Sequence, residues 1–293
     1  MPMEESPALR KDLEERIAAL PCWRGPIALE PLLGGLTNLS WVARDGGERF
    51  VVRCGDDIPV HHVFRDRERA AARAAHEAGL SPELVHAEAG ISVLRYVDGR
   101  TFEEADLAAN LERIVPLLQR CHRSLGRHVR GPANAFWVFH VIRDYVACLG
   151  AAPRYAAIAD RLEAAQVALP IAFGHHDLLP GNLIDDGSRL WLIDWEYAGF
   201  GTAMFDLANL SSNGGFDAAH DAALLESYFG APADAALGRA FAAMKAASAL
   251  REALWSEVSA AHLRTPGVDY GQHAGTYFAR FEAALAEFDR TQS

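Results

Sequence analysis

A polar loop followed by a short hairpin, in the second half of the chain, constrains the fold more than any other feature. The loop sequence is Gly174-His175-His176-Asp177-Leu178-Leu179-Pro180-Gly181-Asn182. Because Pro180-Gly181 cannot continue a helix, the segment is predicted to be a tight loop. Such a loop can direct Asp177 and Asn182 into one cleft.

A predicted hairpin brings a second carboxylate back to this loop. Apolar runs at residues 183–184 and 190–193 flank Asp185-Asp186-Gly187-Ser188, in which Asp-Gly is a turn signal. Asp194 follows the second run, twelve residues after Asn182. Because a hairpin folds back on itself, Asp194 is expected to lie close to Asn182.

These side chains have the chemistry of metal-assisted phosphoryl transfer. Mg²⁺ is held by one or two carboxylate or carbonyl oxygens together with phosphate oxygens and water, which suits Asn182 and Asp194. Asp177 then remains to orient a hydroxyl group or to accept its proton. Since positioning and charge neutralisation supply most of the rate, a carboxylate with a pKa near ~4 suffices as the base.

The same residues have other interpretations. His-His-Asp could be part of a zinc site, but adjacent histidines on an extended loop point in different directions, and no third nitrogen or sulfur ligand lies nearby in the sequence. Asp194 could cap a neighbouring helix, and His175 could simply support the loop. The full pattern is much rarer than any of its parts, so we favour phosphoryl transfer.

Composition and charge narrow the class of protein. The chain has 293 residues, enough for two lobes or one large domain, and it is 50% hydrophobic and 23% charged, as soluble globular proteins are. Its net charge of −11 argues against nucleic acid or an anionic membrane as a partner. The charge agrees mildly with a cationic small-molecule substrate, although plain solubility is the better explanation of the charge alone.

Cysteine spacing and the N-terminal residues favour a cytoplasmic protein. The four cysteines lie far apart without Cys-x2-Cys spacing, which predicts reduced thiols rather than a disulfide framework. Residues 1–20 carry charges throughout, and no run approaches ~20 apolar residues, so neither export nor a membrane span is expected. Nothing in the sequence indicates an oligomeric state.

The first hundred residues are predicted to form a small β-rich lobe of the kinase-like type. Strands are expected at residues 27–33, 39–43 and 49–53, with a turn at 45–47. Between the first two strands lies Gly34-Gly35-Leu36-Thr37-Asn38. There Gly35, Thr37 and Asn38 can present backbone N–H groups and small polar side chains to phosphate oxygens, although two glycines between strands are also typical of a plain hairpin.

Arg53 and Glu68 form a candidate ion pair at the nucleotide phosphates. Arg53 ends a strand, and Glu68 lies in a helix predicted over 65–78 that ends at Gly79. Arginine makes bidentate contacts to planar oxyanions and is therefore competent where protein kinases use lysine. In isolation Glu68 would be assigned to a solvated helix face among several arginines; with the rest of the pattern we favour the pair.

A strand at residues 91–97 is predicted to lead from one lobe to the other. Backbone groups of Tyr96 and Val97 are placed there to hydrogen-bond an adenine. From Thr101 the apolar period becomes helical, with Thr101-x-x-Glu104 as a capping box. Further helices are expected at 138–149, 155–167, within 218–258 and at 272–288. The predicted domains are a nucleotide-binding lobe at 1–97 and a catalytic and substrate-binding lobe at 98–293.

With these motifs the chain resembles a known family, the choline/ethanolamine kinases, within the wider group that includes the aminoglycoside phosphotransferases. The resemblance extends from Gly34 to about Trp255. It rests on the glycine loop, Arg53, Arg65-x-x-Glu68, His175-x-Asp177-x4-Asn182, Ile193-Asp194-Trp195-Glu196-Tyr197, Phe205-Asp206-Leu207-Ala208-Asn209 and Leu254-Trp255-Ser256.

The resemblance implies a two-lobed, protein-kinase-like α+β fold and a set of roles. Asp177 would be the catalytic base, and Asn182 and Asp194 would hold Mg²⁺ at the phosphates of ATP. Arg53 and Glu68 would anchor the phosphates, with Thr37 and Asn38 under the nucleotide.

The resemblance also implies where an alcohol substrate would bind. The family holds a trimethylammonium group in a cage of aromatic rings and carboxylates, through cation–π attraction. Trp255 matches one of the family's helix tryptophans, Glu252 replaces its companion, and Asn213 stands where a glutamate is expected. With Glu196, these residues are expected at the substrate end; Tyr270 and Tyr277 are candidates for a further ring, whereas Trp195 and Tyr197 are expected to pack behind the metal site.

The sequence thus predicts an ATP-dependent kinase for the hydroxyl group of a small amino alcohol, choline first. The near alternative is a kinase for another small cationic alcohol, such as ethanolamine, thiamine or an aminoglycoside. The alternative of a different class is a noncatalytic binding protein that keeps the kinase-like fold.

Overall fold

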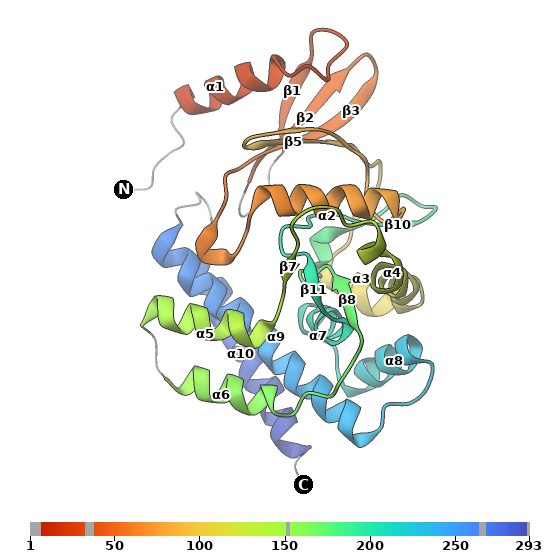
Figure 1. Ribbon diagram of the computed structural model, residues 1–293, viewed down its shortest axis with the longest axis vertical. Helices are drawn as coiled ribbons and strands as arrows, with labels where there is room; N and C mark the ends of the chain where they lie inside the picture. The colour runs from red at the N-terminus through yellow and green to blue at the C-terminus, as the bar shows by residue number, and fades with distance from the viewer. Residues whose placement is uncertain (1–6, 33–37, 151–152, 264–267, 292–293) are drawn as a thin grey trace.

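The computed structural model describes residues 7–32, 38–150, 153–263 and 268–291 (Figure 1). A small lobe built around an antiparallel sheet lies at one end of the molecule, and a larger, mainly helical lobe forms the rest (Figure 1). This arrangement confirms the two-lobed α+β fold expected from the sequence.

The small lobe is a five-stranded antiparallel sheet with two helices. Its strand order is β1-β2-β3-β5-β4. The strands β2 and β3 are joined by the predicted turn, where Gly46 and Gly47 adopt positive φ angles of 55° and 90°. The elements are α1 (Pro7–Ala18), β1 (Ala28–Leu32), β2 (Leu39–Asp45), β3 (Glu48–Cys54), the 3₁₀ turn η1 (Pro59–His61), α2 (Arg65–Glu77), β4 (Leu84–Glu88) and β5 (Ile91–Arg95).

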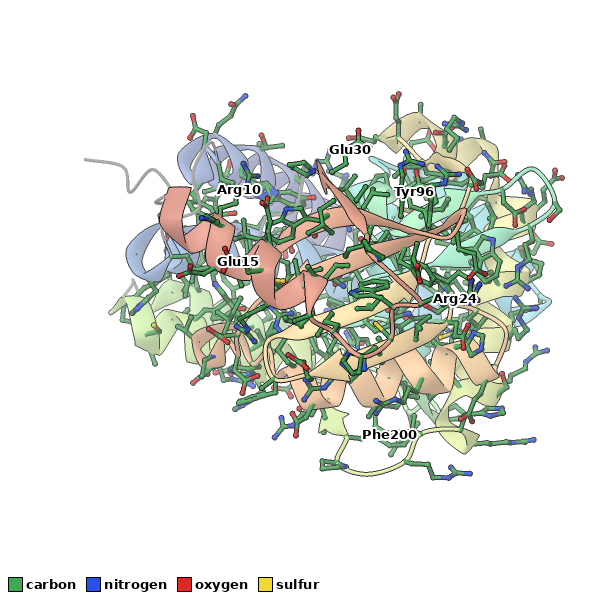
Figure 2. The ribbon with its side chains drawn as sticks, turned by 90° about the horizontal axis from the view of Figure 1, so that it is seen from above. Arg10, Glu15, Arg24, Glu30, Tyr96 and Phe200 are labelled. Carbon is green, nitrogen blue, oxygen red and sulfur yellow. The ribbon has the colours of Figure 1, made fainter. Side chains whose placement is uncertain are left out.

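The small lobe has a hydrophobic core of its own. Trp41, Val52 and Val93 point from alternate positions of the strands into a buried cluster, as the period of two of a strand requires. Ile17, in the last turn of α1, and Leu20, just after the helix, close the cluster from outside the sheet. Figure 2 looks onto this lobe from above and shows α1 lying beside the strands, over the larger lobe.

Helix α2 connects the two lobes physically. Its buried alanines, Ala71, Ala72, Ala74 and Ala75, belong to the core of the large lobe rather than to that of the sheet. Small side chains let the helix approach closely, and its polar face, with Arg65 and Glu68, remains turned toward the active-site region. The predicted boundary after residue 97 falls between β5 and β6 (Arg100–Thr101). Helix α2 therefore belongs to the small lobe by its position in the chain, although its alanines pack in the core of the large lobe.

The large lobe is organised around one long, almost fully buried helix, α9 (Ala235–His262). Alanine-rich faces allow α5, α7 and α10 to pack on α9 from different sides (Figure 1). Two small sheets, β10-β9-β6 and β7-β11-β8, carry the loops of the candidate site.

The remaining elements of this lobe follow in chain order. They are β6 (Arg100–Thr101), α3 (Glu104–Ala109), α4 (Leu111–Ser124), the 3₁₀ turn η2 (Leu125–Arg127), β7 (Asn134–Ala135), α5 (Val138–Leu149), α6 (Arg154–Glu163), β8 (Ile171–Gly174), the 3₁₀ turn η3 (Pro180–Asn182), β9 (Leu183–Asp185), β10 (Leu190–Leu192), β11 (Gly199–Thr202), α7 (Ala203–Asn213), α8 (Ala218–Phe229) and α10 (Tyr270–Arg290).

One local prediction was wrong. Thr101 lies in β6 and does not cap a helix; the capping box is formed by Glu103 and Asp106 at the start of α3. Asp106 also binds Arg100, and β6 pairs with β9, so tertiary pairing takes Thr101 away from the helix. The other predicted helices and strands are present, with ends shifted by a few residues.

Two further findings bear on the expectations from composition. All four cysteines are free, as predicted. In the part of the chain that the structure describes, every helix is too short or too polar to cross a bilayer.

Candidate active site

The loop after β8 is held in place by one buried carboxylate. Asp206, in the first turn of α7, accepts hydrogen bonds from the backbone nitrogens of His175 (2.9 Å) and His176 (2.7 Å). Its Oδ2 also lies 2.8 Å from Nε2 of His122 on α4. Burial alone would raise the pKa of Asp206, but the His122 hydrogen bond and the neighbouring imidazoles hold it below its usual range. A charged anchor therefore fixes the start of the loop.

The same helix face holds the rest of the loop. Asn209 accepts a hydrogen bond from the backbone nitrogen of Leu178 at 2.6 Å, and Asn213 donates to the carbonyl of Leu178 at 3.1 Å. Asp206, Asn209 and Asn213 are spaced by three and four residues, so they share one side of α7. Asp177 is thus flanked on both sides by anchored backbone.

The residue before Asp177 is strained and tightly enclosed. His176 has a φ of 63°, a left-handed conformation that is unfavourable for a residue with a β-carbon. Its ring stacks on Phe136, with centroids 4.3 Å apart, and a β-carbon at Gly174 would lie 2.5 Å from its Nε2. Burial lowers the pKa of His176 to about 4, so the ring is neutral at pH 7.

Asp177 and Asn182 meet as the sequence predicts. The Asn182 amide nitrogen donates to the backbone oxygen of Asp177 at 2.8 Å and lies 3.3 Å from its Oδ2. The amide oxygen of Asn182 therefore points to the other side of its side chain, where it can bind a cation. Both side chains are almost buried, at 7% and 8% exposed. Burial raises the pKa of Asp177, which Arg251 opposes.

The predicted hairpin is present and returns Asp194 to Asn182. β9 and β10 pair in antiparallel register, Gly187 turns the chain with a φ of 85°, and the backbone nitrogen of Ile193 donates to the Asn182 carbonyl at 3.0 Å. Asp194 follows with a φ of 67°, a second strained non-glycine residue. Strain at two carboxylate-bearing loops is typical of sites whose geometry is imposed by the surrounding fold.

The oxygen donors at this corner fit a magnesium ion. Asn182 offers an amide oxygen, and Asp194 offers a carboxylate whose Oδ1 is taken by Arg53 at 2.8 Å, which leaves Oδ2 for a cation. Such hard oxygen ligands, completed by phosphate and water, are what Mg²⁺ prefers. Their roles as metal ligands remain a prediction.

The expected ion pair of the small lobe is also present. Arg53 Nη1 lies 3.0 Å from Glu68 Oε1, and Arg53 Nη2 contacts Asp194. Burial acts to lower the pKa of Arg53, but the carboxylates of Asp194, Glu68 and Glu196 outweigh it and raise the pKa above its ordinary value, so the guanidinium stays charged. One cation therefore joins β3, α2 and the loop after β10.

The remaining residues predicted at the nucleotide lie in different positions. Asn38 lies against Gly55, beside Arg53 and Arg65 in a small cleft. The Tyr96 amide donates to the Arg49 carbonyl at 3.0 Å, so an adenine contact from Tyr96 would use its carbonyl. Val97 follows Tyr96 between β5 and β6 and is half-buried. Gly35 and Thr37 lie outside the described residues.

Glu196 was expected at the substrate, and the structure places it against Arg65. The two atoms Glu196 Oε2 and Arg65 Nη1 are 3.0 Å apart, and the same Nη1 lies 2.7 Å from Glu68 Oε2. Both side chains are nearly inaccessible, at 5% and 8% exposed. Burial, then the charges of Asp194 and Glu68, raise the pKa of Glu196, while the two arginines lower it.

The substrate end contains a buried arginine that was not predicted. Arg251 on α9 is 1% exposed, donates to Glu252 at 2.6 Å, and lies 3.7 Å from Asp177 Oδ1. Its guanidinium covers the ring of Tyr197 at 4.3 Å. Within the described chain, its Nε and Nη2 atoms have no hydrogen-bond partner. The signal that could have identified it is the adjacent charged pair Arg251-Glu252 within an alanine-rich helix.

Trp255 lies inside the protein. It is 4% exposed, its indole nitrogen donates to the Tyr197 hydroxyl at 2.8 Å, and its ring packs against His61, Tyr270 and His273. Tyr277 donates to Asn213 at 2.9 Å, so both polar groups of the Asn213 side chain are engaged by protein. In this conformation these residues brace the loop and the core, and their contact with a substrate remains a prediction.

Comparison with known proteins places the chain in a family. The model of the phosphotransferase enzyme family matches residues 28–246. A solved structure described as a choline/ethanolamine kinase family protein from Mesorhizobium loti is 31% identical, with a TM-score of 0.76, and the alignment covers 96% of this chain and 97% of that one.

Two further relatives are less similar to this chain in sequence. The solved choline kinase LicA from Streptococcus pneumoniae is 22% identical, with a TM-score of 0.77 and 97% and 99% coverage, which at this identity shows the shared fold. Protein LicA of Haemophilus influenzae is 26% identical over 211 residues, or 67% of this chain. The match spans 61% of that relative's length.

Proposed function

The chain belongs to the phosphotransferase enzyme family and to its choline/ethanolamine kinases, and on this premise we propose that it transfers the γ-phosphoryl group of ATP to the hydroxyl group of a small amino alcohol, choline first. That the protein is a small-molecule kinase follows from its family, and the identity of the acceptor alcohol is the proposal. The observation that supports phosphoryl transfer is the convergence of Asp177, Asn182 and Asp194 on one loop and hairpin, and the carboxylates of Asp177 and Glu252 support an amino alcohol as the acceptor.

The nucleotide end of the proposal rests on Arg53. Its guanidinium is fixed by two carboxylates from different lobes, which makes it a preorganised anchor for phosphate oxygens. Asn182 and Asp194 would hold Mg²⁺, which when bound neutralises the charge of the phosphates.

Asp177 is the proposed base. Its Oδ2 faces the Asn182 amide, and its Oδ1 faces the substrate end near Arg251. It would orient the alcohol hydroxyl toward the γ-phosphorus and accept its proton as the alcohol oxygen bonds to that phosphorus, while the bond from the γ-phosphorus to the β-phosphate oxygen breaks and ADP leaves. Because the side chain is enclosed, competing water is kept from the reacting atoms.

The carboxylates of Asp177 and Glu252 support an amino alcohol as acceptor. Together with Arg251 they carry a net negative charge, which a substrate ammonium would neutralise. Choline is supported by the family name of the Mesorhizobium loti structure, which is 31% identical to this chain.

A second candidate is a kinase for another small cationic alcohol, namely ethanolamine, thiamine or an aminoglycoside. One observation favours ethanolamine or an aminoglycoside, whose cations are ammonium groups that bear N–H: the Arg251 guanidinium already covers the Tyr197 ring, so this ring is not open to a trimethylammonium group in this conformation. A primary ammonium needs hydrogen-bond acceptors rather than a ring, and Glu252 can supply them.

The test is Mg²⁺-dependent ATP consumption by the purified protein with choline, ethanolamine, thiamine and kanamycin, beside Asp177→Asn as an isosteric control. Choline-dependent turnover that the variant loses would support the proposal in full. Turnover with another alcohol would keep the mechanism and replace choline. Absence of turnover with every alcohol would favour the noncatalytic binding protein.

A further inference from the structure

Five charged side chains at the junction of the lobes form a closed ring, which we call the ion ring. Arg53 contacts Glu68 and Asp194; Arg65 contacts Glu68 and Glu196; and the chain itself joins Asp194 to Glu196 through Trp195. The four contacts measure 3.0, 2.8, 2.7 and 3.0 Å. Arg53 comes from β3, Arg65 and Glu68 from α2, and the other two from the loop after β10.

Arg65 is held rigidly at its place in the ring. Its backbone nitrogen donates to Asp57 Oδ1 at 2.7 Å, and its Nε donates to the Asp56 carbonyl at 2.9 Å. With these two bonds the guanidinium has little freedom to follow a moving partner. Glu196 therefore meets a fixed donor on the small-lobe side.

The loop that carries Asp194 is fixed at both ends by the ring. Asp194 has a left-handed φ of 67°, which is unfavourable for a non-glycine residue and persists only where neighbouring contacts impose it. Arg53 binds the first residue of the segment and Arg65 binds the last, while the Trp195 indole donates to Ser81 at 3.2 Å. Release of Glu196 would remove the restraint that Arg65 places on the end of this segment.

We propose that Glu196 is a positioning residue that acts through Arg65: the pair aligns the phosphate-anchoring Arg53–Glu68 with Asp194, so that the two lobes are assembled for phosphate binding as one unit. The inference rests on the proposed phosphotransfer and changes the role that the sequence suggested for Glu196. A side chain 5% exposed and engaged by Arg65 supports the nucleotide end rather than contacting the alcohol.

A double-mutant cycle tests the proposal. Glu196→Gln and Arg65→Gln are each expected to lower kcat/KM for ATP by about 10- to 100-fold, as loss of supporting contacts around a site does. KM for the alcohol is expected to stay within about twofold, because neither residue touches it. The double variant is expected to be no worse than the worse single variant, since one shared link is lost in each case.

Arg73→Gln is the matched control. Arg73 lies on the same helix, two turns further on, and is exposed, so the same substitution should leave both KM values unchanged. If Glu196→Gln fails to fold, Glu196→Asp keeps the charge but withdraws it from Arg65, and the same loss of kcat/KM for ATP is expected. All rates are measured well below the melting temperature of each variant, so that a purely structural role would leave them unchanged.

Two outcomes would overturn the inference. A rise in KM for the alcohol with an unchanged KM for ATP in Glu196→Gln would make Glu196 a substrate contact. Losses that multiply in the double variant would show that the two residues act independently. If the wild-type protein turns over no alcohol, the proposed function fails but the inference is still tested by equilibrium binding of MgATP, which both single variants should weaken to the same extent.

Discussion

The indole nitrogen of Trp255 donates a hydrogen bond to the hydroxyl group of Tyr197 at 2.8 Å, and in this conformation the contact lies in the interior of the large lobe. Tyr197 in turn supports the Arg251 guanidinium on its ring. Through Arg251, the Trp255–Tyr197 pair is linked to Asp177, the proposed base.

Trp255→Phe should therefore affect stability more than substrate binding. The change removes one buried hydrogen bond, worth about 1 kcal/mol, and leaves the Tyr197 hydroxyl unpaired at a cost of roughly 1–3 kcal/mol. A lower midpoint of urea unfolding with an unchanged KM for choline is expected. A rise in KM of about tenfold without loss of stability would return Trp255 to the substrate site.

Asp194→Asn should reduce turnover by at least about 10²- to 10³-fold, the range seen when one preorganised charge-stabilising group is lost. The amide keeps the shape but removes the charge that faces both Arg53 and the predicted metal position. Steady-state kinetics over a Mg²⁺ titration measure the effect. Asp186→Asn, in the exposed turn of the same hairpin, is the control and should retain wild-type rates.

Arg251→Met should destabilise the fold by about 3–5 kcal/mol, because it leaves the buried Glu252 carboxylate without its cation. Adding Glu252→Gln should recover much of this loss, since the uncompensated charge is then removed. Urea unfolding of the two single variants and the double variant measures the recovery. Equal or greater instability of the double variant would show that packing of Arg251 on Tyr197, and not charge, is what matters.

Gly174→Ala should be poorly tolerated. A β-carbon there would lie 2.5 Å from His176 Nε2 and 2.9 Å from Asp206 Oδ2, so the anchored loop would have to shift. Overpacking of this kind costs about 1–3 kcal/mol, and a displaced Asp177 should also lower kcat. Gly181→Ala in the same loop is the control, because a β-carbon at Gly181 meets no atom within 4 Å. Melting temperature and kcat of both variants decide the matter.

Stability should fall below pH 6.5 partly because of His61. Its ring is 1% exposed and hydrogen-bonded to Tyr145 and Ser259, and burial lowers its pKa to about 3, with smaller effects from the cations Arg251, His62 and His262. Between pH 6.5 and about 3 the unfolded chain binds a proton there that the folded chain does not. Acidification across this window therefore costs about 1.4 kcal/mol per pH unit.

The variant His61→Gln removes this titratable ring, so comparing its unfolding free energy with that of the wild type at several pH values tests the assignment. The variant should be less stable than wild type at pH 7, and the difference in unfolding free energy should shrink as the pH falls from 6.5 to 4. His220→Gln, on the exposed surface of α8, should show no such convergence. A constant difference for His61→Gln across the window would contradict the assignment.

Local sequence patterns were sufficient to predict the fold class and the central residues of the candidate site. The alternation of apolar residues, Asp-Gly turns and the loop sequence around Asp177 act over a few residues, so the sequence alone determined most strands and helices, the hairpin, and the meeting of Asp177, Asn182 and Asp194. Arg53 and Glu68 were also paired correctly, because their positions on adjacent elements follow from the kinase-like order of the small lobe.

Only the tertiary structure decided the partners of Glu196, Trp255 and Arg251. Glu196 meets Arg65 across 131 residues, and Trp255 meets Tyr197 across 58. Arg251 comes to Asp177 from a helix whose every side is buried. On a helix that is buried around its circumference, the sequence shows no hydrophobic period from which the direction of a side chain could be predicted. The packing of neighbouring elements sets that direction, and in a low-dielectric interior it determines which ion pairs form.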